Sequence, residues 1–148
     1  MKKTLLILLL FIPLMAFSQT NYYVRWDGND SNTGTGTATN QAWKTIQHSL
    51  ETIDAGDTLF VMDDGGSFMP TGYTHGSDVY YWYPDDEYGN TGTSSNPIVI
   101  INYPGDTPVI DFSNVVEQGD YNTGMYVYGV HYVTMKGLTF QDLDPTGS

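Results

Sequence analysis

The sequence predicts an all-β fold built as a solenoid, in which short parallel strands stack along one axis and a helix covers the first turn. An amphipathic helical segment leads directly into a fully apolar strand at residues 42–63. Further along, apolar strands of three to five residues are separated by sharp corners of one or two residues. Such strands are too short and too close for a sandwich, where strands come about every 8–12 residues with hairpin turns.

The helix is predicted over residues 43–53. Its apolar residues Trp43, Ile46, Leu50 and Ile53 recur at intervals of three and four, which places them on one helical face. Gly56 suits the left-handed conformation that ends helices, and residues 58–62 then form a buried strand. Because the end of a solenoid is an exposed sheet edge, we expect this helix to cover it.

The remaining strands follow from short apolar and β-branched runs bounded by turn-forming residues. A long irregular segment, residues 65–96, separates the early strand at 58–62 from the later ones. A loop of that length inside a compact domain is usually functional or mobile. Strands are predicted at residues 21–26, 58–62, 98–101, 109–112, 125–128, 132–135 and 138–140.

The N-terminal residues predict that the protein is exported, and the C-terminal residues predict that the chain continues beyond Ser148. Residues 1–18 have the charged start, apolar centre and small-residue end of a signal peptide cleaved after Ser18. No cysteine is present, so a lipid-anchored start is excluded and the fold has no disulfides. Residues 19–148 are therefore expected to form one domain of a secreted, periplasmic or cell-surface protein. The turn-like residues 144–148 suggest a fragment that continues beyond Ser148.

The charge balance excludes several classes of partner. The chain carries 17 acidic residues and has a formal net charge of −12. After the signal peptide, only Arg25, Lys44 and Lys136 remain as strong bases. Such a surface repels nucleic acid and anionic membranes, so neither is an expected partner. It also repels acidic polysaccharides over long range, unless Ca²⁺ or local basic residues intervene.

The aromatic residues of the long loop are the candidate substrate-binding residues. Tyrosine and tryptophan rings present flat faces on which the C–H groups of sugars pack. The alternative is that these rings fold the loop back onto the helix. Consecutive aromatic residues in an extended chain point alternately to opposite sides, so we expect some of them to be exposed. The candidates are Tyr80, Tyr81, Trp82, Tyr83 and Tyr88.

The same loop contains the densest group of acids, which is a candidate calcium site. Ca²⁺ prefers several carboxylate oxygens, although a solvated acidic loop is the alternative. Residues 27–34 are also rich in oxygen ligands, but Ala38 stands where a calcium loop needs an acid, which favours a plain turn. The candidate ligands are Asp78, Asp85, Asp86 and Glu87.

The order of motifs YYV…GNDSNTGT…AWKTIQHSLETIDAGDTLFV…GTSSNPIVIINYPGDTPVID…YVTMKGLTF resembles the N-terminal region of secreted bacterial right-handed parallel β-helix proteins. These belong to the pectate-lyase-like superfamily. The resemblance implies an N-terminal capping helix plus the first coils of a right-handed parallel β-helix solenoid. It implies a monomeric polysaccharide lyase, or a glycoside hydrolase, acting on pectin, alginate or chondroitin, with Ca²⁺ as cofactor and the active site outside this chain.

No catalytic residue can be assigned to this sequence. The alternative to a polysaccharide-degrading enzyme is a non-catalytic surface adhesin or glycan-binding protein. Lys136 is the only strong base in the C-terminal half, and a lysine can abstract the proton beside a carboxylate. Its position next to Gly137 favours a solvent-facing turn residue instead.

Overall fold

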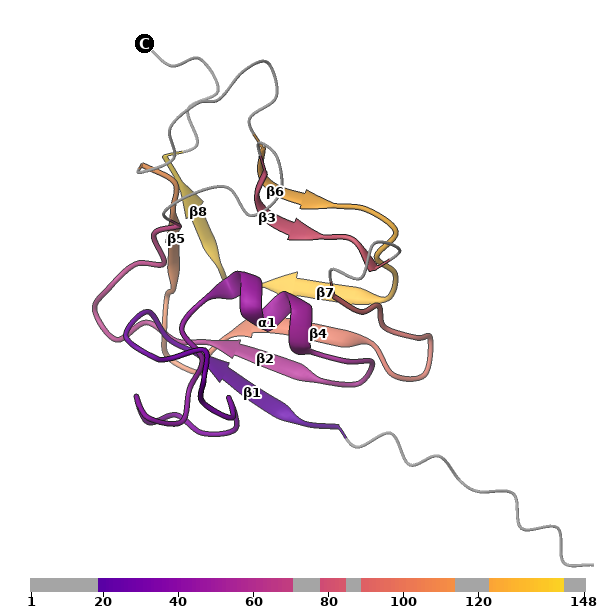
Figure 1. The fold of residues 1–148 in the computed structure, drawn as a ribbon, viewed down its shortest axis with the longest axis horizontal. Coiled ribbons are helices and arrows are strands. Elements are labelled where there is room, and N and C mark those ends of the chain that lie inside the picture. The colour runs from indigo at the N-terminus through magenta and orange to yellow at the C-terminus, as the bar shows by residue number, and fades with distance from the viewer. Residues whose placement is uncertain (1–18, 71–77, 85–88, 114–122, 143–148) are drawn as a thin grey trace, which may run out of the picture.

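The computed structural model describes residues 19–70, 78–84, 89–113 and 123–142 (Figure 1). Over these residues the chain forms eight short strands and one helix. The elements, in chain order, are β1 (Asn21–Val24), α1 (Ile46–Thr52), β2 (Thr58–Val61), β3 (Asp78–Trp82), β4 (Ile98–Asn102), β5 (Val109–Asp111), β6 (Thr123–Val127), β7 (Val133–Lys136) and β8 (Thr139–Gln141).

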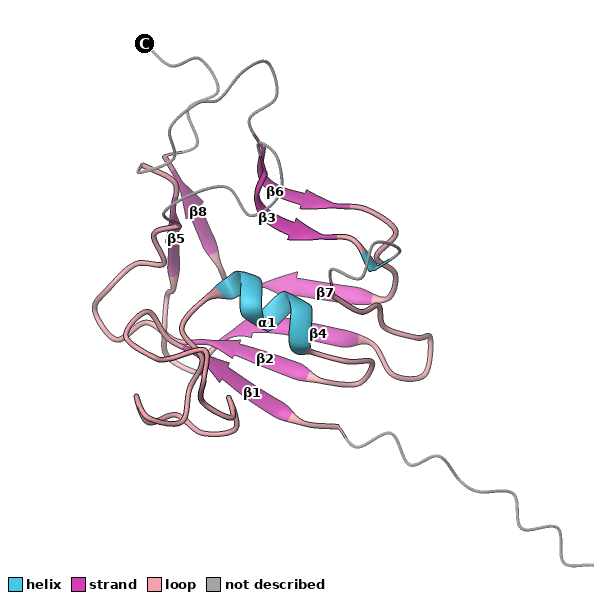
Figure 2. Cartoon of the chain, viewed as in Figure 1, coloured by secondary structure: helices cyan, strands magenta, loops and turns pink. Residues whose placement is uncertain are grey.

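The strands form three parallel sheets, and Figure 2 shows α1 in front of the largest of them. The largest sheet has the order β1-β2-β4-β7, and the two smaller sheets pair β3 with β6 and β5 with β8. Every strand pair is parallel. Parallel neighbours need a crossover connection, so each strand finds its partner through a long excursion of the chain.

The prediction of an all-β, right-handed parallel β-helix solenoid is wrong. The described residues form a small mixed domain of parallel sheets with one short helix, and no solenoid is detected in them. A regular solenoid adds one strand to each sheet on every turn. Here β1 and β2 both join the four-stranded sheet, and the chain between them supplies α1 but no strand to either smaller sheet. The sequence predicted short parallel strands, but it did not predict which strands share a sheet.

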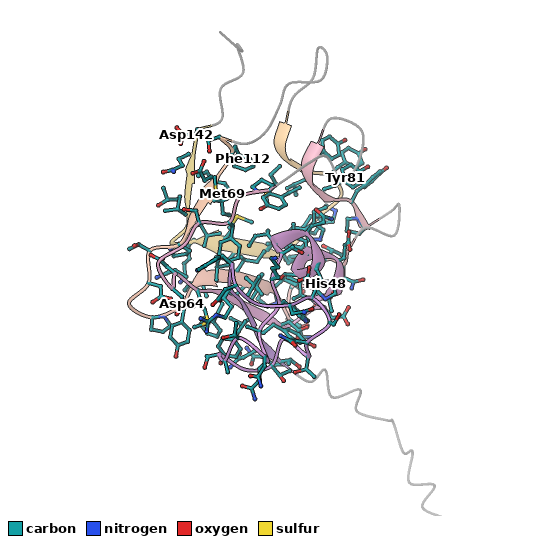
Figure 3. The ribbon with its side chains drawn as sticks, turned by 60° about the vertical axis from the view of Figure 1, so that its left-hand side comes forward. His48, Asp64, Met69, Tyr81, Phe112 and Asp142 are labelled. Carbon is teal, nitrogen blue, oxygen red and sulfur yellow. The ribbon has the colours of Figure 1, made fainter. Side chains whose placement is uncertain are left out.

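The hydrophobic core lies between α1 and the inward faces of the three sheets (Figure 3). Alternate residues of each strand point inward, as the pleat requires, so that Leu59 and Val61 of β2 and Ile98 and Ile100 of β4 are buried. From the helix, Ile46 and Leu50 enter the same core, and Ile53 follows directly after it. The predicted apolar helix face is thus confirmed for these three residues.

The helix begins three residues later than predicted, because Trp43 is held in extended conformation. Its N–H donates to the Tyr23 carbonyl (2.9 Å) and its carbonyl accepts from the Arg25 N–H (3.0 Å), which pairs it with β1. Thr45 is the N-cap, and its hydroxyl accepts from the His48 N–H at 3.2 Å. Asp30 fixes this start by accepting hydrogen bonds from the backbone of Lys44 and Thr45.

In each of the three sheets, the strand that comes first in the chain has a free edge, and one residue outside the sheet hydrogen-bonds to the backbone of that edge. Trp43 closes the edge of β1 as described above, and Phe68 closes that of β5 by bonding the backbone of Val109 and Asp111. Gln47 of α1 closes β3: its amide donates to the Tyr81 carbonyl (2.9 Å) and accepts from the Tyr81 N–H (2.8 Å). A side-chain amide here replaces the peptide group of a neighbouring strand.

Candidate functional site

The aromatic residues of β3 divide between the two faces of the sheet. Tyr80 and Trp82 point inward and are buried, with the Tyr80 ring edge-on to Phe112 at 6.0 Å. The Trp82 indole donates a hydrogen bond to the Asn90 carbonyl at 2.9 Å. Burial raises the pKa of the Tyr80 phenol above its usual value. These two predicted substrate-binding residues therefore lie in the core.

Tyr81 and Tyr83 lie on the opposite face, where they meet tyrosines of β6 and the residue after it. The parallel register places Tyr126 beside Tyr81, and their rings stack at 5.3 Å with an interplanar angle of 9°. Tyr128 meets the Tyr83 ring edge-on at 4.9 Å and stacks with Tyr126 at 6.3 Å. We call Tyr81, Tyr83, Tyr126 and Tyr128 the tyrosine cluster.

Only part of the tyrosine cluster faces solvent. Tyr81 is 5 % exposed, since Gln47 holds its backbone and Tyr126 covers its ring. Tyr126 and Tyr128 are 36 % and 54 % exposed, so their outer surfaces are accessible. Figure 3 shows Tyr81 at the end of the molecule formed by β3, away from Asp64. The sequence predicted Tyr81 and Tyr83 but missed Tyr126 and Tyr128, whose only signal was alternate spacing in a predicted strand.

The other candidate residues of the long loop fall largely outside the described part of the chain. Tyr88 and the predicted calcium ligands Asp85, Asp86 and Glu87 belong to residues 85–88, which the structure does not describe. Asp78 starts β3 and pairs with Thr123, but its side chain is likewise not described. The calcium prediction therefore stays a prediction.

Within the described ranges, no group of three or more histidine, aspartate or glutamate residues is placed to hold a metal ion. The loop at residues 27–34 is a set of turns, as the sequence favoured: Asn29 accepts a hydrogen bond from the Ser31 N–H at 2.9 Å. Asp111 is the half-buried last residue of β5, and the backbone N–H of Ser113, which donates to its carboxylate at 2.9 Å, lowers the pKa of that group. No helix among the described residues is long and apolar enough to cross a membrane.

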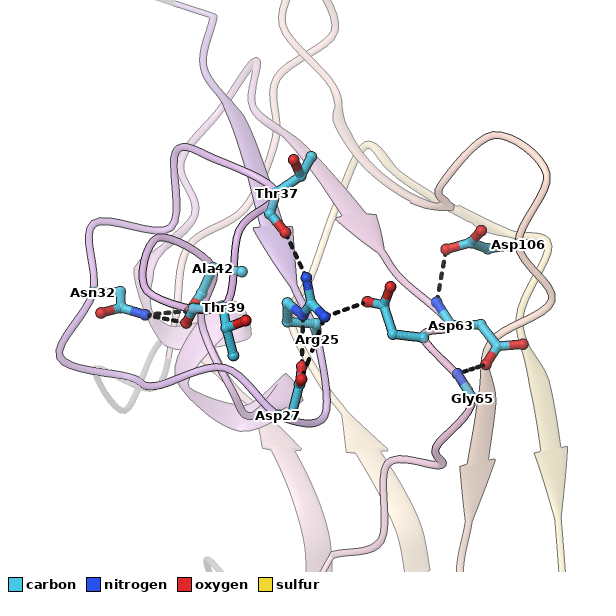
Figure 4. Close-up of polar contacts among 10 residues, drawn as sticks. Arg25, Asp27, Asn32, Thr37, Thr39, Ala42, Asp63, Gly65 and Asp106 are labelled. Carbon is cyan, nitrogen blue, oxygen red and sulfur yellow. Dashed lines mark hydrogen bonds and ion pairs between the residues drawn. The ribbon is translucent and has the colours of Figure 1, made fainter.

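The basic residues have different environments. Arg25 is held by carboxylates on two sides: it pairs with Asp27 at 2.5 Å and with Asp64 at 3.1 Å, and it donates to the Thr37 carbonyl (Figure 4). Lys136 is exposed on β7 and forms no ion pair with any described residue. Lys136 therefore lies in a strand and not in the turn that the sequence favoured.

No family model matches the chain, and no curated protein matches it. Among solved structures, a rhamnogalacturonan lyase matches with a TM-score of 0.62 and 20% sequence identity over 82% of this chain. The chain spans 28% of the length of that structure. Identity at this level shows a shared fold only, so the chain resembles one part of a rhamnogalacturonan lyase.

This match also corrects the resemblance drawn from the sequence motifs. The described residues form parallel sheets with one short helix and no solenoid, and the matched structure is a rhamnogalacturonan lyase. The assignment of this chain to the right-handed parallel β-helix proteins of the pectate-lyase-like superfamily is therefore wrong. The motifs used for that assignment are the short strands and corners, which parallel sheets of this domain also contain. They were therefore not specific for the solenoid.

Proposed function

We propose that this chain is part of a secreted protein that degrades an acidic polysaccharide by a lyase-type reaction, and that the tyrosine cluster binds the polysaccharide. The observation that carries the proposal is the exposed pair Tyr126 and Tyr128, whose rings stack on each other while the buried Tyr81 ring supports Tyr126 from beneath. Large aromatic rings stacked at a surface provide flat apolar area with little entropy to lose on binding. The structural likeness to a rhamnogalacturonan lyase supports a polysaccharide as the ligand.

The binding part of the proposal is tested by measuring affinity for rhamnogalacturonan, polygalacturonate and dextran. Tyr128→Ala is expected to weaken binding of an acidic polysaccharide about three- to tenfold, the loss typical of one aromatic contact. Tyr128→Phe keeps the ring and should bind like the parent. Phe140→Ala is the control, because it removes an aromatic ring that is also exposed (45 %) but lies on β8, in another sheet. It should bind like the parent.

The binding proposal is wrong if Tyr128→Ala and Phe140→Ala bind every polysaccharide as the parent does. It is also wrong if both variants lose affinity equally, because exposed apolar area in general would then explain the binding.

The reaction is tested separately by incubating the protein with the same uronate polysaccharides and following the absorbance of unsaturated products. Product formation supports a lyase. Binding without product, in the full-length protein, supports the alternative of a non-catalytic adhesin or glycan-binding protein.

Export and calcium complete the proposal. The signal-peptide pattern of residues 1–18 supports a secreted protein, and N-terminal sequencing of the exported chain should give Gln19 first.

The acids at positions 78 and 85–87 support Ca²⁺ binding, which titration calorimetry with CaCl₂ tests. Substitution of Asp85 and Asp86 by Asn should remove the heat of binding, and an unchanged heat would contradict this assignment.

A further inference from the structure

The outward face of the four-stranded sheet carries a second row of apolar side chains that ends in a cation. The register places Tyr23 of β1 beside Phe60 of β2, Phe60 beside Ile101 of β4, and Ile101 beside Lys136 of β7. Their neighbours in sequence, such as Leu59 and Ile100, are buried on the inner face, so these four share the outer face. We call them the outer row.

The aromatic end of the outer row is a group of three packed rings. The rings of Tyr23 and Phe60 stack at 5.4 Å with an interplanar angle of 18°. Tyr103, in the turn after β4, stands edge-on to both rings at 6.1 Å and fixes their position. All three residues are partly exposed, so one side of the stack stays open to solvent.

The opposite end of the row presents a positive charge. Lys136 is exposed and forms no ion pair with the described residues, unlike Arg25, which is neutralised by Asp27 and Asp64. The net charge of −12 repels an anionic ligand at long range, so only a local cation can hold one. Lys136, without an ion pair among the described residues, is such a cation beside the apolar row, and it favours a ligand with its own negative charge.

We propose that the outer row is a second carbohydrate-binding surface, in which an anionic sugar lies over Phe60 and Ile101 and its carboxylate contacts the Lys136 ammonium group. The row crosses four strands and is about 14 Å long at a strand spacing of about 4.8 Å. That length fits a short run of sugar units. It is small for a protein partner, since stable protein interfaces bury about 800 Å² on each side. The proposal rests on the proposed function for the class of ligand, but not for the site.

The test compares two probes that differ in charge, an oligogalacturonate and a neutral galactan oligosaccharide of the same length. Lys136→Gln is expected to weaken oligogalacturonate binding about two- to fivefold, as for one exposed ion pair, and to leave galactan binding unchanged. Added salt should reduce the difference between parent and variant. Lys44→Gln removes the same charge from an exposed site before α1 and should have no effect.

A second variant tests the ring stack. Phe60→Leu keeps an apolar side chain but removes the flat ring, and it should weaken binding of both oligosaccharides. The proposal is overturned if Phe60→Leu and Lys136→Gln bind oligogalacturonate as the parent does, or if Lys44→Gln matches Lys136→Gln. It is also overturned if sedimentation shows that Phe60→Leu dissociates a dimer of the parent, because a second copy would then cover the row.

The two surfaces are distinguished by Tyr128→Ala. If only Tyr128→Ala loses affinity, the outer row does not bind sugar and the tyrosine cluster does. If only Phe60→Leu and Lys136→Gln lose affinity, the outer row binds and the tyrosine cluster does not.

Discussion

The side chain of Gln47 offers the sharpest test of how this fold closes its sheets. It is buried, and its amide makes two hydrogen bonds with the backbone of Tyr81 that a neighbouring strand would otherwise supply. Gln47→Met keeps the length and apolar stem of the side chain but removes both polar groups. The Tyr81 N–H and carbonyl then lose these partners at the edge of β3.

The expected loss of stability follows from those two backbone groups. Leaving a buried donor or acceptor without its partner costs about 1–3 kcal/mol for each group, so Gln47→Met should lower the free energy of unfolding by about 2–6 kcal/mol. Gln47→Glu keeps an acceptor for the Tyr81 N–H but places an oxygen against the Tyr81 carbonyl. It should therefore also destabilise the protein.

Urea denaturation followed by circular dichroism measures this loss as a lower midpoint at unchanged slope. Glu51→Gln is the matched control, because Glu51 is exposed and accepts only the outer bond from Gln47 at 2.8 Å. The free energy of unfolding of this control should stay within about 0.5 kcal/mol of that of the parent. A Gln47→Met variant that also stays within about 0.5 kcal/mol would falsify the view that the amide replaces a strand.

Three further predictions concern the core and the backbone. Leu50→Ala should lower the free energy of unfolding by about 2–5 kcal/mol in urea, because Leu50 is fully buried in the helix face. Burial raises the pKa of Tyr80, so the native state keeps a proton that the unfolded chain releases above about pH 10, and stability falls as the pH rises further. Tyr80→Phe should therefore lose less thermal stability than the parent between about pH 8 and about pH 11. Tyr132 has a φ of 52°, so Tyr132→Gly should be more stable than Tyr132→Ala by about 1 kcal/mol, and equal melting points would contradict strain at this position.

Local signals in the sequence predicted most strands because each depends on a few neighbouring residues. The apolar run at residues 58–62 becomes β2, and the runs at 98–101 and 109–112 become β4 and β5. Gly56 has the expected positive φ of 98°. These features follow from β-branched content and from the conformational freedom of glycine, which need no knowledge of distant contacts.

The features that the sequence did not reveal depend on partners far along the chain. The sequence predicts an irregular segment where β3 forms, because nothing local assigns Tyr80 and Tyr81 to opposite faces of a strand. The structure assigns them through distant contacts: Tyr80 is buried in the core, and the Tyr81 ring stacks on Tyr126. Trp43 fits the helical period, yet backbone pairing with Tyr23 holds it extended. Tertiary contacts override local propensity in both cases.

Tyr81 connects the closed edge of β3 to the proposed binding surface. Gln47 holds its backbone from the helix side, while its ring stacks on Tyr126 at the solvent side. If α1 positions the tyrosine cluster, Gln47→Met should bind polysaccharide more weakly than the parent even in water, where both proteins are folded. Glu51→Gln should bind like the parent. Unchanged affinity of Gln47→Met would instead show that pairing between β3 and β6 is sufficient to align the rings, and the helix would then contribute stability alone.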